Sequence, residues 1–163
     1  MIIIADTSSL IALALCESLD ILNKLFEEVK VSNTVFDEAC MPGKPKADIL
    51  EKFLKGKVVD VDQDELVIGG KFLDIGELSS ILLYQHLKAD YLLIDEQIGR
   101  RIAKLNHVKV IGSLGVLIEA KNKRIISTIK PQIEILKLSK IYFSQDLLNH
   151  ALKLTNEDTK KYL

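Results

Sequence analysis

Two wholly apolar runs, each followed by an aspartate, constrain the fold of this chain more than any other feature. Residues 1–5 (MIIIA) precede Asp6, and residues 91–94 (YLLI) precede Asp95. An apolar run without alternating polar residues is typical of a strand that is covered on both faces, as strands of parallel sheets are. The two runs therefore predict central strands of a parallel sheet, each with an acidic residue at its end.

Helical patterns alternate with apolar runs along the chain, as they do in parallel sheets with crossover helices. We expect strands at residues 1–5, 30–32, 57–61, 91–94 and 108–111. We expect helices at residues 8–16 (capped by Ser8 or Ser9), 18–29, 46–54, 74–88, 96–106 and 113–121, and one more capped by Asn33. The sequence thus predicts an α/β fold with a central parallel sheet of about four or five strands and helices on both faces.

The C-terminal part of the chain is predicted to be helical. Residues 127–163 suggest two or three helices, one opened near Pro131 and another capped by Ser144. We interpret them as a helical extension of the same domain. Residues 1–163 then form one domain, which suits a chain of this length.

Composition narrows the class of protein. Hydrophobic residues make up 48% of the 163 residues, enough for a core without disulfides. Cys16 and Cys40 lack the spacing of metal ligands, and no run reaches the roughly 18 apolar residues of a membrane helix. We therefore expect a cytoplasmic protein with no membrane partner. With a net charge of −1, attraction to nucleic acid must come from local basic patches.

Four acidic residues are expected to meet at one edge of the sheet. Asp6 and Asp95 follow strands directly, and open parallel sheets bind ligands beyond the carboxyl ends of their strands. Glu38 and Glu77, each near the start of a helix, can point to the same edge. Converging carboxylates repel one another unless a cation neutralises them, and oxygen donors favour Mg²⁺ or Mn²⁺ over Zn²⁺. Such ions activate water for phosphodiester hydrolysis, so the pattern predicts nuclease chemistry.

The two aspartates also fit a purely structural role. Aspartate is a preferred residue at the N-terminus of a helix, and both Asp6 and Asp95 precede predicted helices. Glu96 could moreover replace Asp95 as the ligand. The position of Asp6 directly after MIIIA favours a functional role.

The two glutamates have structural alternatives as well. Glu77 lies three residues after Asp74, which is the spacing of a capping box. Glu38 has Asp37 beside it, and a single acid on an amphipathic helix usually faces solvent. Position alone does not favour Glu38 over Asp37. Even so, one shared site explains the set of four acids better than four coincidences do.

The sequence resembles the PIN-domain ribonucleases over nearly the whole chain. The likeness rests on A-D-T-S at residues 5–8, V-F-D-E-A at 35–39, D-x-G-E-L at 74–78, L-L-I-D-E at 92–96 and G-S-L-G-V-L-I-E-A-K at 112–121. With its last motif, the chain most resembles the small prokaryotic PIN proteins that carry such a segment after the last strand. No motif is specific alone, but their order and spacing together are.

This resemblance implies a three-layer PIN-like fold and a Mg²⁺- or Mn²⁺-dependent endoribonuclease that cleaves RNA. The catalytic residues and metal ligands that it implies are Asp6, Glu38, Glu77 and Asp95, with Ser8 and Ser113 as polar neighbours that contact substrate. It also suggests a toxin of the VapBC type, held inactive by a small antitoxin protein, and a homodimer. Many relatives have a further aspartate after the position of Asp95, where this chain has Glu96 and Gln97, so the number of bound ions stays open.

Basic residues on the helix after Asp95 are candidates for contact with substrate. Of Arg100, Arg101 and Lys104, we expect Arg100 to bind RNA phosphates, because the other two fit an ordinary solvated face equally well.

Other phosphate chemistries fit less well. The phosphate-binding loop pattern of nucleotide hydrolases is absent, and Thr7 and Ser8 stand where receiver domains or aspartyl phosphatases need a second acid. The alternative to a nuclease is a non-catalytic PIN-like scaffold that binds RNA or a protein.

Overall fold

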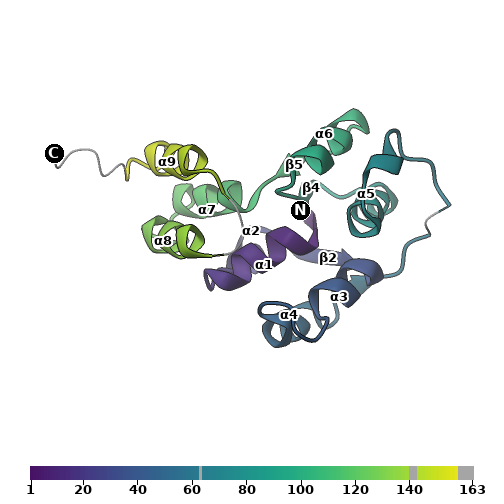
Figure 1. Cartoon of the computed structure of the whole chain (residues 1–163), viewed down its shortest axis with the longest axis horizontal. Coiled ribbons are helices and arrows are strands. Elements are labelled where there is room, and N and C mark those ends of the chain that lie inside the picture. Colours follow the sequence, from purple (N-terminus) through teal and green to yellow (C-terminus); the bar gives the residue numbers. More distant parts are fainter. Residues whose placement is uncertain (63, 140–142, 158–163) are drawn as a thin grey trace.

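The computed structural model describes residues 1–62, 64–139 and 143–157. Five strands form an all-parallel sheet in the order β3-β2-β1-β4-β5. Figure 1 labels β2, β4 and β5 among the helices. The strands are β1 Ile2–Ala5, β2 Glu28–Ser32, β3 Val58–Val59, β4 Tyr91–Leu93 and β5 Val110–Ile111. The predicted α/β fold with a parallel sheet of four or five strands is confirmed.

Helices fill most of the chain between and after the strands. The α-helices are α1 Thr7–Leu15, α2 Asp20–Leu25, α3 Asn33–Ala39, α4 Ala47–Leu54, α5 Ile75–Leu87, α6 Gln97–Leu105, α7 Ser113–Asn122, α8 Lys130–Leu138 and α9 Gln145–Leu154, and Gly70–Phe72 form a short 3₁₀ helix, η1. Among the residues described, no helix is both long and apolar enough to cross a membrane.

Strand β1 lies at the centre of the sheet and is covered on both faces. Ile3 pairs with Val29 of β2 and with Tyr91 of β4. Ile3 and Ala5 belong to one hydrophobic cluster and Ile4 to another, and all three side chains are fully buried. Successive side chains of a strand point to opposite faces, so a strand between two layers of helices has no polar position. This explains the continuous apolar run.

The two clusters lie on opposite faces of the sheet and define three layers. Helices α1, α2, α3, α4, α7, α8 and α9 contribute to the first cluster, and α5 and α6 to the second. In Figure 1, α7, α8 and α9 gather at one end of the molecule and α5 and α6 at the other. The three-layer arrangement agrees with the PIN-like fold that the sequence predicts.

The structure corrects the predicted boundary between the second helix and the second strand. Helix α2 ends at Leu25 and β2 begins at Glu28, whereas the sequence predicts helix to residue 29 and strand from residue 30. The backbone of Phe26 is already extended, and Val29 pairs with Ile3. The buried side chains of Val29 and Val31 alternate as a strand requires.

Two predicted helix starts also differ from the structure. Helix α1 begins at Thr7, with Asp6 in the N-cap position, so neither Ser8 nor Ser9 caps it. Helix α3 is capped by Ser32, whose Oγ accepts a hydrogen bond from the backbone N–H of Val35 at 3.0 Å. The predicted cap, Asn33, is the first residue of that helix.

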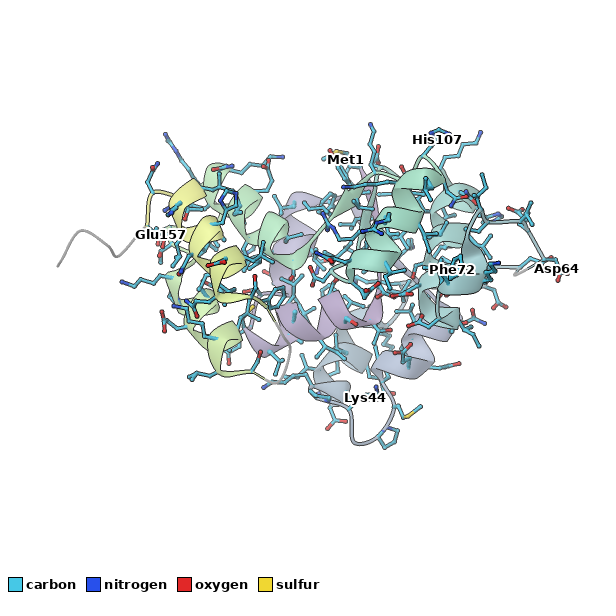
Figure 2. All side chains as sticks on the ribbon, turned by 45° about the horizontal axis from the view of Figure 1, so that its top comes forward. Met1, Lys44, Asp64, Phe72, His107 and Glu157 are labelled. Atoms are coloured by element: carbon cyan, nitrogen blue, oxygen red, sulfur yellow. The ribbon has the colours of Figure 1, made fainter. Side chains whose placement is uncertain are left out.

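Helices α8 and α9 begin as the sequence predicts. Pro131 lies in the first turn of α8, and Ser144 caps α9. Glu157, just beyond α9, accepts a hydrogen bond from Lys121 of α7 at 2.6 Å (Figure 2). Residues 140–142 and 158–163 of the predicted extension lie outside the described residues, and a single domain over residues 1–163 stays a prediction.

Candidate active site

The two aspartates that follow β1 and β4 leave the sheet at the same edge. Ala5 pairs with Leu93, and the backbone N–H of Asp6 donates to the carbonyl oxygen of Leu93 at 3.0 Å. Asp95 lies two residues after Leu93, just beyond the end of the neighbouring strand β4. Because the strands are parallel, both acids lie at the carboxyl end of the sheet, where ligands of such folds bind.

Asp6 is a buried carboxylate that does not cap the helix it precedes. It occupies the N-cap position of α1, but its side chain makes no capping hydrogen bond, and only 4% of the residue is exposed. Burial raises the pKa of Asp6 to about 7; a hydrogen bond from the Thr7 backbone opposes this, and the charges of Glu77, Asp74 and Glu38 add to it. Capping therefore does not explain this residue.

Gly76 lies where three carboxylates converge. A Cβ atom added to Gly76 would lie 2.9 Å from Glu38 Oε2, 3.3 Å from Asp74 Oδ1 and 3.8 Å from Asp6 Oδ1. These three acids come from α3, from the N-cap of α5 and from the end of β1. Glu38 is half-buried here, whereas its neighbour Asp37 is exposed. The structure thus brings Glu38 to the predicted cluster.

Glu77 takes part in a capping box and is also buried close to the other acids. It forms a capping box with Asp74: the Glu77 N–H donates to Asp74 Oδ1 at 2.8 Å, and the Asp74 N–H donates to Glu77 Oε2 at 3.2 Å. The residue is only 8% exposed, and its Oε1 lies 3.3 Å from the point that a Cβ of Gly99 would occupy. Burial raises the pKa of Glu77; a hydrogen bond with the Asp74 backbone opposes this, and the charges of Asp74, Glu96 and Glu38 add to it.

Asp95 is oriented by Ser113 at the start of α7. Its Oδ1 accepts from the Ser113 N–H at 2.8 Å, and its Oδ2 accepts from the Ser113 hydroxyl at 2.7 Å. The cap of α6 is Glu96, which accepts from the Gly99 N–H at 2.7 Å. Asp95 thus follows the strand beside β1 and is oriented by Ser113, whereas Glu96 caps α6 and its charge also acts on Glu77.

The predicted substrate residues lie in different settings. Arg100 Nη1 donates to the carbonyl oxygen of Ile94 at 2.8 Å. A Cβ on Gly112 would lie 3.1 Å from that Nη1 and 2.9 Å from Asp95 Oδ1, so the two side chains flank one backbone position. Ser8 is exposed in the first turn of α1, whereas Ser113 is fully buried and contacts Asp95.

Sequence reasoning missed two residues of the cluster. Asp74 was expected only to cap α5, yet its carboxylate also lies near Gly76 with those of Glu38 and Asp6. Gly76 was given no role. A signal was present in the D-x-G-E-L motif, because glycine in the first turn of a helix costs stability and needs a packing or functional reason.

The cluster fits a divalent cation in the chemistry of its donors. It offers carboxylate oxygens, which Mg²⁺ and Mn²⁺ prefer, and Thr7 next to Asp6 has a buried Oγ1 without a hydrogen-bond partner in the described chain. Within residues 1–62, 64–139 and 143–157, however, no three His, Cys, Asp or Glu side chains are grouped as a formed metal site. The residues that would hold a cation are the predicted set, Asp6, Glu38, Glu77 and Asp95, with Asp74 beside Glu38 and Asp6 at Gly76.

Comparison with known proteins identifies the family of the chain. A family model described as a PIN domain matches residues 2–157 of the chain. No curated protein and no solved structure matches the sequence.

Proposed function

Because the chain belongs to the PIN-domain family, whose members are generally nucleases, we propose that it is a Mg²⁺- or Mn²⁺-dependent endoribonuclease that hydrolyses RNA phosphodiester bonds. The observation that carries this proposal is the convergence of Glu38, Asp74 and Asp6 oxygens around Gly76. Asp6, which is buried among like charges, costs stability unless a cation neutralises it. A buried carboxylate with a strongly raised pKa at a sheet edge is typical of a functional site.

The proposed roles of the residues follow from their settings. Mg²⁺ or Mn²⁺, when bound, supplies an activated water and neutralises charge that develops on the phosphate. The predicted set of four, Asp6, Glu38, Glu77 and Asp95, would hold the cation, and Ser113 keeps Asp95 in one orientation. These four acids are the proposed catalytic residues.

The proposed contacts to RNA lie beside the acids. One guanidinium nitrogen of Arg100 binds the Ile94 carbonyl, which leaves its other N–H donors for a phosphate oxygen. Ser8 is exposed at the start of α1, two residues after Asp6, and can donate its hydroxyl to the same substrate. Arg100 and Ser8 would thus place the RNA backbone over the acidic cluster.

The test compares RNA cleavage by variants of three acids: Asp6, which follows the central strand, and the neighbours Glu38 and Asp37 on α3. Purified wild type is incubated with RNA and Mn²⁺ or Mg²⁺ beside Asp6→Asn, Glu38→Gln and Asp37→Asn. We expect the first two variants to lose about 100-fold or more in cleavage rate, because each loses a ligand. Asp37→Asn is the matched control: it is exposed, adjacent to Glu38, and should cleave like wild type.

Two results would overturn the proposal. Cleavage by Asp6→Asn at the wild-type rate would show that a contaminant or another site cuts the RNA. Absence of both cleavage and Mn²⁺ uptake in the wild type would favour the alternative, a PIN-like scaffold that binds RNA or a protein without cutting.

We also propose that the protein is the toxin of a VapBC-type pair, with a small antitoxin as its partner. The likeness of residues 112–121 to small prokaryotic PIN proteins supports this, and so does apolar surface close to the acids. Phe72, Ile75 and Ile98 are 68%, 63% and 53% exposed (Figure 2 labels Phe72). Ile75 precedes Gly76 and Ile98 precedes Gly99, the two glycines that lie against Glu38 and Glu77.

The partner proposal has its own test. The double variant Ile75→Asp/Ile98→Asp should still cleave RNA but resist inhibition by a small protein encoded beside this one. Equal inhibition of the double variant and the wild type would show that these residues are not the docking surface. A homodimer is proposed from the family resemblance, and light scattering of the purified protein tests it.

A further inference from the structure

A chain of buried hydrogen bonds connects the two helices that carry Glu38 and Glu77. The backbone N–H of Val35 donates to Ser32 Oγ at 3.0 Å, and Ser32 Oγ lies 2.7 Å from Ser79 Oγ. Ser79 Oγ in turn donates to the carbonyl oxygen of Gly76 at 2.8 Å. Ser32 and Ser79 are fully buried, so no water competes for these bonds.

The direction of this chain follows from the number of protons. A hydroxyl has one proton to donate, and Ser79 gives its proton to Gly76. Ser32 must therefore donate to Ser79, while it accepts from Val35. Each hydroxyl is both donor and acceptor, and the chain runs from the first turn of α3 to the first turn of α5 without an unpaired group.

The chain of hydrogen bonds ends at Gly76, next to which the Glu38 carboxylate lies. Glu38 Oε2 is 2.9 Å from the position that a Cβ of Gly76 would occupy, which is closer than a real Cβ contact allows. Glu38 is on α3 and Gly76 is on α5, so the distance between the two helices determines how near Glu38 comes to Asp6. The Ser32–Ser79 bond joins these helices next to the cluster.

We propose that Ser32, Ser79 and Gly76 are positioning residues for Glu38. The serine pair holds α3 against α5, and the missing side chain of Gly76 leaves the space into which the Glu38 carboxylate fits beside Asp6. None of the three would touch substrate or cation. The inference rests on the proposed function, because it assigns these residues to the binding of the same divalent cation.

Ser80 provides a matched control for Ser79. It lies on the same helix, is fully buried and donates to the same Gly76 carbonyl at 2.9 Å, but no described hydrogen bond joins it to α3. Ser79→Ala and Ser80→Ala both remove one hydroxyl bond to Gly76. Only Ser79→Ala also removes the acceptor of the Ser32 hydroxyl.

The measurement is Mn²⁺ affinity by calorimetry without RNA. We expect Ser79→Ala to bind Mn²⁺ about 10-fold more weakly or worse, as variants of residues that orient metal ligands do. Ser80→Ala should stay within about twofold of wild type, and Ser79→Thr, which keeps the hydroxyl, should restore binding. Wild-type affinity in Ser79→Ala, or an equal loss in Ser80→Ala, would overturn the proposal.

A second pair of variants tests the space at Gly76. A Cβ would lie 2.9 Å from Glu38 Oε2 at Gly76 and 2.9 Å from Ile111 Cγ1 at Gly115, so both sites are equally tight and both are helical. Gly76→Ala should weaken Mn²⁺ binding at least 10-fold and Gly115→Ala should not. Equal Mn²⁺ affinity of Gly76→Ala and wild type would contradict the positioning role.

The outcomes also separate this inference from the proposed function. If the wild type takes up no Mn²⁺, the metal-dependent nuclease and the positioning role fall together. If the wild type binds Mn²⁺ and Ser79→Ala binds it equally well, only the positioning role falls.

Discussion

Asp6 is held in surroundings that penalise its charge. Burial, with Glu77, Asp74 and Glu38 nearby, raises its pKa from 3.8 to about 7. The unfolded chain therefore loses this proton near pH 4, while the folded chain keeps it up to about pH 7. Between these values the folded state binds more protons, so its stability relative to the unfolded state falls as the pH rises.

Asp6→Asn should consequently stabilise the metal-free protein at neutral and alkaline pH. The amide cannot ionise, and each pKa unit of the shift corresponds to about 1.4 kcal/mol. We expect a higher melting temperature than wild type at pH 8 in chelator, by roughly 2 to 4 °C for each kcal/mol gained. The difference should shrink as the pH falls and vanish near pH 4. Circular dichroism melts across this range measure it.

The exposed neighbour of Glu38 serves as the control for this prediction. Asp37→Asn makes the same change at an exposed aspartate and should leave the melting temperature close to that of the wild type. If Asp6→Asn melts at or below the melting temperature of wild type at pH 8, the charge of Asp6 does not destabilise the folded state.

For single residues, the sequence points to Asp6 and Glu38, whose oxygens lie near Gly76, but it does not show how each acid is held. Asp6 and Glu77 both fit capping patterns in the sequence, yet the side chain of Asp6 makes no capping bond, whereas that of Glu77 completes the capping box whose N-cap is Asp74. A capping bond depends on the side-chain rotamer, which spacing does not encode. Ser113 shows the same limit: its place beside the site was expected, but its two hydrogen bonds to Asp95 were not.

For whole elements, the sequence predicts centres well and ends poorly. Strands β1 and β4 follow from apolar runs, because a strand buried on both faces admits little else. The end of α2 and the start of β2 do not, because Phe26 and Val29 fit a helical pattern and become strand-like only when Val29 pairs with Ile3. Such pairing is a long-range contact that a local pattern cannot contain.

Glu157 fastens the end of α9 to α7 and to the start of α8. Its carboxylate accepts hydrogen bonds from Lys121 Nζ at 2.6 Å, from the Ile129 and Lys130 backbone N–H groups and from the Thr128 hydroxyl. Burial by itself would raise the pKa of Glu157, but the bonds from Lys121, Thr128 and Ile129 outweigh it and lower the pKa to about 2.

Glu157→Gln should therefore destabilise the protein at neutral pH. Hydrogen bonds to a charged group contribute about 1.5 to 3 kcal/mol, and part of this is lost with the charge. Because the folded pKa lies below the usual 4.5, the contribution is present above about pH 4.5 and disappears as the pH falls toward 2. Urea unfolding at several pH values should show the wild type and variant converging in acid.

Glu134→Gln is the comparison for this loss. Glu134 lies on α8 and pairs with Lys137 at 3.5 Å, but it is exposed, and exposed pairs contribute about 0 to 1 kcal/mol. If both variants unfold at the same urea concentration at pH 7, Glu157 does not hold these helices together.

At the scale of the whole molecule, cation binding should link segments that are far apart in the sequence. Asp6 follows β1, Glu38 lies on α3 and Glu77 lies on α5, so a ligand that binds them together binds only the folded chain. Stability then rises by mass action, by about 2.7 kcal/mol at a concentration 100 times the dissociation constant. Calorimetric melts with increasing Mn²⁺ should show this rise in wild type and little of it in Asp6→Asn. An equal rise in both would place the ion elsewhere.

The family and the overall fold were predictable, and they are confirmed by the match over residues 2–157 and by the five-stranded parallel sheet. The antitoxin and the dimer remain proposals for a physical reason. Contacts with another molecule produce no repeating pattern in the sequence. Exposed apolar residues such as Phe72 and Ile98 do not identify an interface, because single apolar residues also occur on the surfaces of monomers.

The strand order has a consequence for synthesis on the ribosome. Strand β1 is made before β4, yet its Ile3 to Ala5 backbone needs Tyr91 to Leu93 as one of its two neighbours. Until residue 93 has left the exit tunnel, one side of the most apolar strand has no partner, and an open apolar edge invites pairing between chains. Before that point the unpaired edge of β1 leaves the nascent chain prone to aggregate, and the acidic cluster cannot assemble.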